Sequence, residues 1–205
     1  MRPLTGIRAV LLDMDGTLVN SDAAVERAWR TWSAEYGVDA ARAVEAGHGN
    51  PAATTIALLL PHLSDQEVAA AADREHELQY DDIADVTAAP GAGRLLATLA
   101  RLDLPWAVVT SADGRLAKAR LTAAGIAPPL LVTVEDVRHG KPDPEGYLLA
   151  AARLGVDPRD CLVVEDSEPG LEAGRQAGAV TAALRGLPGD VRLSDLGQLA
   201  DLLPS

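Results

Sequence analysis

The chain has 205 residues, nearly half of them hydrophobic, so it can bury the core of one medium domain or of a core with a small insertion. Its 18 basic and 30 acidic residues give a formal net charge of −12, which argues against nucleic acid or an anionic membrane as a partner. With no Phe in the chain, the core must be aliphatic.

Cysteine content and hydropathy limit the compartment. Cys161 is the only cysteine, so an intrachain disulfide is impossible, and a reducing compartment fits. The first residues show no charged-then-apolar signal pattern, and no apolar run reaches the roughly 18 residues that a membrane span needs. We therefore expect a cytoplasmic protein.

The first predicted element is a strand over residues 9–12, which ends at Asp13 and Asp15. A short apolar run that stops at turn residues is typical of a strand buried on both faces of a parallel sheet. Ligands and chemistry collect beyond the carboxyl ends of such strands. Two carboxylates in that position are costly unless a proton or a cation relieves them, and oxygen ligands favour Mg²⁺. The alternative interpretation is a helix-capping aspartate plus a turn aspartate.

Residues 21–89 carry helical patterns and no strand-like run. Apolar periodicity, a proline start and a capping box predict helices over residues 21–36, 51–60 and 64–82. An all-helical block that directly follows the first strand predicts a cap over the site. The expected organisation is a core of residues 1–19 and 90–205, with a helical cap of residues 20–89.

After residue 90 the pattern becomes an alternation of helices and strands. The predicted strands cover residues 106–110, 130–134, 161–164 and 180–184. The predicted helices cover residues 93–101, 116–124, 145–154 and 171–177, and a short helix is expected in the tail after Gly186. Strands that alternate with helices of about ten residues predict an α/β fold with a doubly wound parallel sheet.

Three of these strands end in polar residues: Asp13 follows the first, Ser111 the second and Glu165-Asp166 the third. Because the carboxyl ends of parallel strands meet at one edge of the sheet, we expect these side chains to converge. A cluster of carboxylates with a nearby hydroxyl suits Mg²⁺-assisted phosphoryl transfer, in which one carboxylate attacks, another moves a proton and a third holds the metal.

The motif Asp13-Met14-Asp15-Gly16-Thr17 resembles the D-x-D-G-T signature of the haloacid dehalogenase-like hydrolase superfamily, and the resemblance extends over essentially the whole chain. It implies that Asp13 is the nucleophile that forms an aspartyl phosphate. It also implies that Asp15 protonates the leaving alcohol and then activates water. Mg²⁺ would be held by Asp13, by the main-chain carbonyl of Asp15 and by Asp166, with Glu165 supporting the metal's surroundings.

The phosphate-binding residues implied by the resemblance are Ser111, the backbone N–H of Ala112, and Lys141. Ser111 also fits the N-cap of a helix, and both roles are compatible because helix N-termini bind anions. Relatives often have Gly where this chain has Ala112. Lys141 matches the family's G-K-P-x-P element, although a solvated surface lysine is the usual interpretation of any one lysine. The glycines Gly170, Gly174 and Gly178 are interpreted as structural.

The predicted cap resembles that of the sugar-phosphate phosphatases in this superfamily, and Glu26 and His48 would then face the substrate hydroxyls. An ordinary loop histidine is the alternative for His48. Asn50 departs from the pattern, since relatives often carry a basic residue there. The expected function is Mg²⁺-dependent hydrolysis of a small phosphorylated substrate, most of all a sugar phosphate, by a monomer or weak homodimer.

Other activities of the superfamily remain as alternatives. A β-phosphoglucomutase-like mutase uses a cap histidine twelve residues after the nucleophile, where this chain has Val25, which transfers no proton. A phosphonate hydrolase needs a cap lysine, and residues 20–89 contain none. A dehalogenase has no use for Asp15, and a non-catalytic binder would be expected to have lost Asp13, Asp15 or Lys141. Glycerol phosphate and phosphoglycolate remain alternative substrates.

Overall fold

The computed structural model describes residues 4–47, 50–80 and 82–204. Within these ranges, six parallel strands form one sheet in the order β5-β4-β1-β6-β7-β8. The strands are β1 (Ala9–Leu12), β4 (Trp106–Val109), β5 (Leu131–Val132), β6 (Cys161–Glu165), β7 (Val180–Ala183) and β8 (Val191–Arg192). The predicted doubly wound parallel sheet is confirmed.

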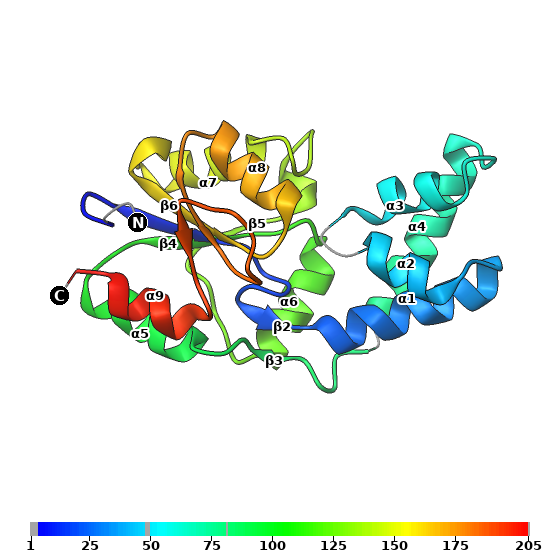
Figure 1. Cartoon of the computed structure of the whole chain (residues 1–205), viewed down its shortest axis with the longest axis horizontal. Helices are drawn as coiled ribbons and strands as arrows, with labels where there is room; N and C mark the ends of the chain where they lie inside the picture. Colours follow the sequence, from blue (N-terminus) through cyan, green and yellow to red (C-terminus); the bar gives the residue numbers. More distant parts are fainter. Residues whose placement is uncertain (1–3, 48–49, 81, 205) are drawn as a thin grey trace.

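Helices cover both faces of this sheet (Figure 1). On one face lie α7 (Glu145–Leu154) and α8 (Glu168–Gln176). On the other lie α5 (Ala92–Arg101), α6 (Gly114–Ala123) and α9 (Leu196–Leu202). No helix among the described residues is both long and apolar enough to cross a bilayer.

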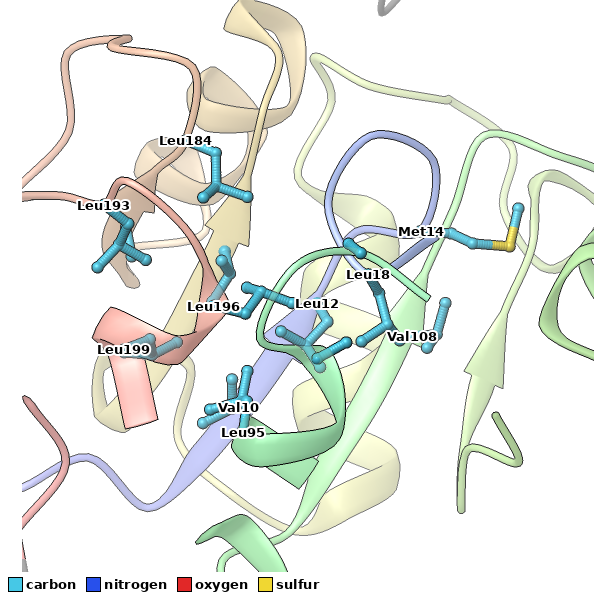
Figure 2. Packing of buried hydrophobic residues seen from close by; sticks show 14 of the residues in the cluster. Val10, Leu12, Met14, Leu18, Leu95, Val108, Leu184, Leu193, Leu196 and Leu199 are labelled. Carbon is cyan, nitrogen blue, oxygen red and sulfur yellow. The ribbon is translucent and has the colours of Figure 1, made fainter. Parts of the chain in front are cut away.

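The strand β1 is buried on both faces, as its uninterrupted apolar run predicted. Val10 and Leu12 pack into the core on the α5 and α9 side, while Ala9 and Leu11 pack into the core under α7 and α8. Figure 2 shows the first of these cores, in which leucines and valines from the sheet meet leucines of α5 and α9. Because β1 lies between β4 and β6, its carboxyl end is flanked by theirs.

Among the described residues, four helices between residues 22 and 80 pack around an apolar cluster of their own. They are α1 (Asp22–Tyr36), α2 (Ala40–Gly47), α3 (Ala52–Leu59) and α4 (Asp65–Tyr80), and they lie to one side of the sheet (Figure 1). Trp32 is fully buried and its indole N–H donates to the carbonyl of Ala71, 3.0 Å away, which joins α1 to α4. The capping box predicted from Ser64 and Glu67 is present.

The structure contains elements that the sequence patterns did not predict. The helix α2 was missed because only Ala43 and Gly47 are buried in it, which is too few for a periodic signal. The short strands β2 (Val19–Asn20) and β3 (Thr87–Ala88) pair antiparallel, so the expectation of no strand between residues 21 and 89 was wrong. Like β8, they have only two residues each, and alternation needs at least four.

A buried carboxylic acid lies inside the helical segment. Glu75, on α4, is 1 % exposed and accepts a hydrogen bond from Gln79 at 2.5 Å. Burial raises the pKa of Glu75 from 4.5 to about 7, against the opposing effects of Gln79 and the Arg120 charge. The folded protein therefore binds this proton more tightly than the unfolded chain, and stability is lost as pH rises from about 4.5 through about 7.

Replacing Glu75 with Gln is expected to remove this pH dependence, because the amide keeps the volume and carries no charge at any pH. Between pH 5 and pH 8 the unchanged protein should lose about 2–3 kcal/mol of stability that the Glu75→Gln variant keeps. Urea unfolding of both proteins at the two pH values measures the difference. The exposed Glu77→Gln variant of the same helix is the control, and an equal pH dependence in all three proteins would contradict the prediction.

Candidate active site

The carboxyl ends of β1 and β6 bring three buried carboxylates together. Asp13 follows β1, and its backbone N–H still pairs with the carbonyl of Val164 at 3.0 Å. Glu165 ends β6, and Asp166 comes next. One carboxylate oxygen from each of Asp13, Glu165 and Asp166 lies within 4.8 Å of the others, and all three residues are buried. The convergence expected from the ends of parallel strands is therefore observed for these three residues.

Lys141 enters this cluster from the loop before α7. Its Nζ lies 2.5 Å from Asp13 Oδ1 and 2.7 Å from Glu165 Oε1, and it donates to the carbonyl of Val109 at 3.0 Å. Burial lowers the pKa of Lys141, but the charges of Asp13 and Glu165 outweigh it and hold this pKa well above its usual value. Lys141 is thus a buried ammonium ion shared by two carboxylates, not a solvated surface lysine.

Besides Lys141, four hydrogen-bond donors bind the Glu165 carboxylate. The Tyr147 hydroxyl donates to Oε1 at 2.8 Å, and the Ser167 hydroxyl donates to Oε2 at 2.9 Å. The backbone N–H groups of Asp166 and Ser167 also donate to Oε2, at 3.1 and 3.2 Å. So many donors fix the Glu165 carboxylate, which in turn fixes the position of Lys141.

The helix α8 leaves room for this carboxylate only because residue 170 is a glycine. A Cβ atom on Gly170 would lie 1.7 Å from Glu165 Oε1, which no side chain tolerates. A Cβ atom on Gly174 would instead meet Val163 at 2.9 Å and Thr181 at 3.1 Å, on the sheet. Gly174 therefore has a structural role, since it permits close packing of helix on sheet, whereas Gly170 makes space for a site residue.

Two of the clustered carboxylates hold their protons more tightly than usual. Burial, and then the charge of Glu165, raise the pKa of Asp13 well above its usual value and that of Asp166 to about 6. Thr17 donates to Asp166 Oδ1 at 3.2 Å, and Arg185 Nε lies 2.7 Å from Oδ2. Repulsion among buried hard oxygen ligands is what a divalent cation relieves, so these residues fit the expected Mg²⁺.

Asp15 has different partners from the three clustered carboxylates. Its Oδ1 accepts a hydrogen bond from the Ser21 hydroxyl at 2.6 Å and lies 2.8 Å from a terminal nitrogen of Arg120. Gly16, with a φ of 78°, turns the chain directly after Asp15. The Asp15 side chain is 27 % exposed, so it is accessible from solvent.

Ser111 follows β4 and lines the same pocket as Lys141. The N-cap of α6 is Asp113, whose carboxylate accepts the N–H groups of residues 115 and 116, so Ser111 does not cap this helix. The backbone N–H of Ala112 donates to the Thr110 hydroxyl at 3.0 Å. Ser111 itself is exposed.

The structure gives contacts for two of the three residues predicted to bind substrate from the helical segment. The Glu26 carboxylate forms an ion pair with Arg30 on the same helix, at 2.6 Å. Asn50 donates from its amide to the carbonyl of Ala46 at 3.0 Å. His48 lies outside the described residues. None of these contacts reaches the carboxylate cluster.

Sequence reasoning missed several residues that hold the site together, namely Ser21, Arg120, Tyr147 and Arg185. For Arg120 a signal existed. It lies on the same face of the predicted helix as Leu116, Ala117 and Leu121, and a charged residue within an apolar stripe indicates a buried partner.

A family model described as haloacid dehalogenase-like hydrolase matches residues 7–178. Hexitol phosphatase A of Escherichia coli (strain K12) is 38% identical over 190 residues, which are 92% of this chain and 88% of that protein. The 2-deoxyglucose-6-phosphate phosphatase 1 of Saccharomyces cerevisiae is 33% identical over 193 residues, with 85% and 78% covered.

Solved structures share the fold over nearly the whole chain. A structure of CbbY from Rhodobacter sphaeroides in complex with phosphate has a TM-score of 0.80 at 26% identity, over 94% of this chain and 96% of that one. A β-phosphoglucomutase from Clostridium difficile has a TM-score of 0.83 at 20% identity, over 94% and 93%. With most of the chain matched by one family model and by these relatives, the resemblance of the motifs is confirmed, and the protein belongs to the haloacid dehalogenase-like hydrolases.

Proposed function

We propose that this hydrolase is a Mg²⁺-dependent phosphatase of small phosphorylated metabolites, with sugar and sugar-alcohol phosphates as its preferred class. The observation that carries the proposal is the buried ammonium of Lys141 beside Asp13, in a cluster of carboxylates suited to a divalent cation. The substrate class is supported by the relatives, which are a hexitol phosphatase and a 2-deoxyglucose-6-phosphate phosphatase.

In the proposed reaction Asp13 attacks the phosphorus atom through a carboxylate oxygen. The bond between phosphorus and the ester oxygen breaks, and Asp15 gives its proton to the departing alcohol. Asp15 then takes a proton from water, whose oxygen attacks phosphorus, and the acyl phosphate bond breaks to restore Asp13. Lys141, Ser111 and the N–H of Ala112 would bind the oxygens of the phosphoryl group.

The carboxylates of Asp13 and Asp166 and the main-chain carbonyl of Asp15 would hold Mg²⁺. When bound, this ion would neutralise charge on the phosphoryl oxygens and allow an anionic nucleophile to approach an anionic substrate. Glu165 would support the site indirectly, because its carboxylate is already occupied by Lys141, Tyr147 and backbone donors.

Residues 20–89 would act as the cap, with residues 1–19 and 90–205 as the core. Glu26, His48 and Asn50 would then select the substrate from the cap side. We expect the enzyme to act in the cytoplasm as a monomer or weak homodimer. The fold is shared with a β-phosphoglucomutase. At the position of the mutase histidine, however, this chain has Val25, which is part of the apolar packing of the helical segment and transfers no proton. This favours hydrolysis over the mutase reaction.

The test is phosphate release from a panel of hexose, pentose and hexitol phosphates, with glycerol phosphate and phosphoglycolate as comparison substrates. We expect release that requires Mg²⁺, that EDTA abolishes, and that is fastest with the sugar or sugar-alcohol phosphates. Isomerisation of a sugar phosphate without release would indicate a mutase instead. No release from any member of the panel would contradict the proposed substrate class.

A further inference from the structure

Arg120 joins the candidate active site to the helical segment. It lies on α6, and the residue is only 2 % exposed. One terminal nitrogen lies 2.8 Å from Asp15 Oδ1, and the other donates to Gln79 Oε1 on α4 at 2.5 Å. Its guanidinium is therefore held at both ends, by a residue that follows β1 and by a residue of the helical segment.

The burial of Arg120 opposes folding. Among the described residues, nothing accepts a hydrogen bond from the buried Arg120 Nε, and an unpaired buried donor opposes folding. A buried ion pair is often no more stabilising than an apolar pair of similar volume. The neighbours of Arg120 on its helix face are Leu116, Ala117 and Leu121, so an apolar residue would pack there. Stability alone gives no reason for an arginine at this position.

The contact has a consequence for the orientation of the Asp15 carboxyl group. Both the Ser21 hydroxyl and Arg120 bind the same oxygen, Oδ1, and neither contact uses Oδ2. With Oδ1 engaged by these two donors, Oδ2 is the oxygen that is available to a substrate. The same two donors also resist rotation of the carboxyl group, which keeps Oδ2 aimed in one direction.

The other end of Arg120 is held by a well-defined joint between α4 and α6. Beside Gln79, the Tyr80 hydroxyl donates to Asp113 at 2.5 Å, and the Arg115 guanidinium lies 4.1 Å from the centre of the Tyr80 ring. These contacts fix α4 on α6 without involving Asp15. They provide an anchor against which the Arg120 guanidinium is held.

We propose that Arg120 is a positioning residue for proton transfer by Asp15, holding Oδ1 so that Oδ2 faces the departing oxygen of the substrate. This inference rests on the proposed function, in which Asp15 is the general acid. It predicts that Arg120 matters when the leaving group needs a proton and matters little when it does not.

The experiment compares kcat/KM for a sugar phosphate and for p-nitrophenyl phosphate, whose phenolate departs without a proton. The ratio kcat/KM includes only the steps up to departure of the leaving group, so the later action of Asp15 on water does not enter. Arg120→Gln should lower kcat/KM for the sugar phosphate by about 10- to 100-fold and for the aryl phosphate by about threefold at most. Asp15→Asn should show the same selectivity with a larger loss.

Two further variants complete the design. Arg120→Lys keeps the charge and should recover part of the loss with the sugar phosphate, and it replaces Arg120→Gln in the comparison if that variant does not fold. Arg115→Gln, on the same helix, alters the same joint without touching Asp15 and should leave the ratio between the two substrates unchanged.

The outcomes separate this inference from the proposed function. If Asp15→Asn is selective for the sugar phosphate but the Arg120 variants lower both substrates equally, Arg120 is merely structural and the inference is wrong. If Asp15→Asn is not selective, the role of Asp15 as general acid is wrong, and the inference is lost with it. Selectivity in the Asp15 and Arg120 variants, absent in Arg115→Gln, supports both.

Discussion

Replacing Asp13 with Asn is expected to abolish turnover while leaving the fold intact. The amide has nearly the volume of the carboxylate but is not a nucleophile, so no acyl phosphate forms. Loss of a nucleophile costs on the order of 10⁴- to 10⁶-fold in rate. Lys141 keeps its contacts with Glu165 and with the carbonyl of Val109, so the substitution leaves no buried charge without a partner.

Phosphate release in the presence of Mg²⁺ measures this loss, and thermal unfolding checks that the variant is folded. Asp201→Asn is a suitable control, because Asp201 is an exposed residue of α9 that pairs with Arg94. It should retain full activity. Turnover by Asp13→Asn well above the uncatalysed rate would contradict a covalent intermediate on Asp13.

Replacing Lys141 with Met is expected to damage both activity and stability. Asp13 and Glu165 would lose the cation that they share, and breaking a buried ion pair from one side costs about 3–5 kcal/mol. Without Lys141 the pKa of Asp13, which burial and Glu165 already raise, would rise further, so less of the nucleophile is ionised. We expect a loss of at least about 10²- to 10³-fold in kcat.

The stability loss should depend on pH, and the sign follows from the raised pKa of Asp13. Because removal of Lys141 raises the pKa of Asp13 further, the folded variant binds a proton there more readily as the pH falls, and Lys141→Met should be less destabilising at pH 5 than at pH 8. Denaturant unfolding at both pH values measures this. The chain has one other lysine, the exposed Lys118, and Lys118→Met is the matched control. Nearly native turnover in Lys141→Met would contradict its role.

The sheet and the carboxylate cluster were predictable because their signals are local. The strand of residues 9–12 is an unbroken apolar run, and its position next to two other strands with polar ends follows from the rules of parallel sheets. Asp13, Glu165 and Asp166 could therefore be grouped without knowing any side-chain contact. Lys141 needed more, since only the resemblance of its loop to a family motif distinguished it from a surface lysine.

The contacts that hold these residues were not predictable. Arg120 meets Asp15 across 105 positions of the chain, and Arg185, which itself has a φ of 52° after β7, meets Asp166 across 19 positions. Such pairs depend on how α6 and the loops after the strands are placed around the sheet, which no periodicity encodes. Glu26 shows the opposite case, because its partner Arg30 lies at helical spacing and this pair could be predicted from the sequence.

The glycine at position 170 shows that part of the active site is an absence of atoms. Glycine inside a helix costs about 1 kcal/mol relative to alanine, and here the missing methyl group is the space that the Glu165 carboxylate fills. A single added carbon on the side of α8 that faces Glu165 would therefore push this carboxylate away from Lys141 without touching any substrate. In related chains, the residue at this position becomes a marker readable from sequence alone: where it carries a side chain, the lysine must be held in some other way.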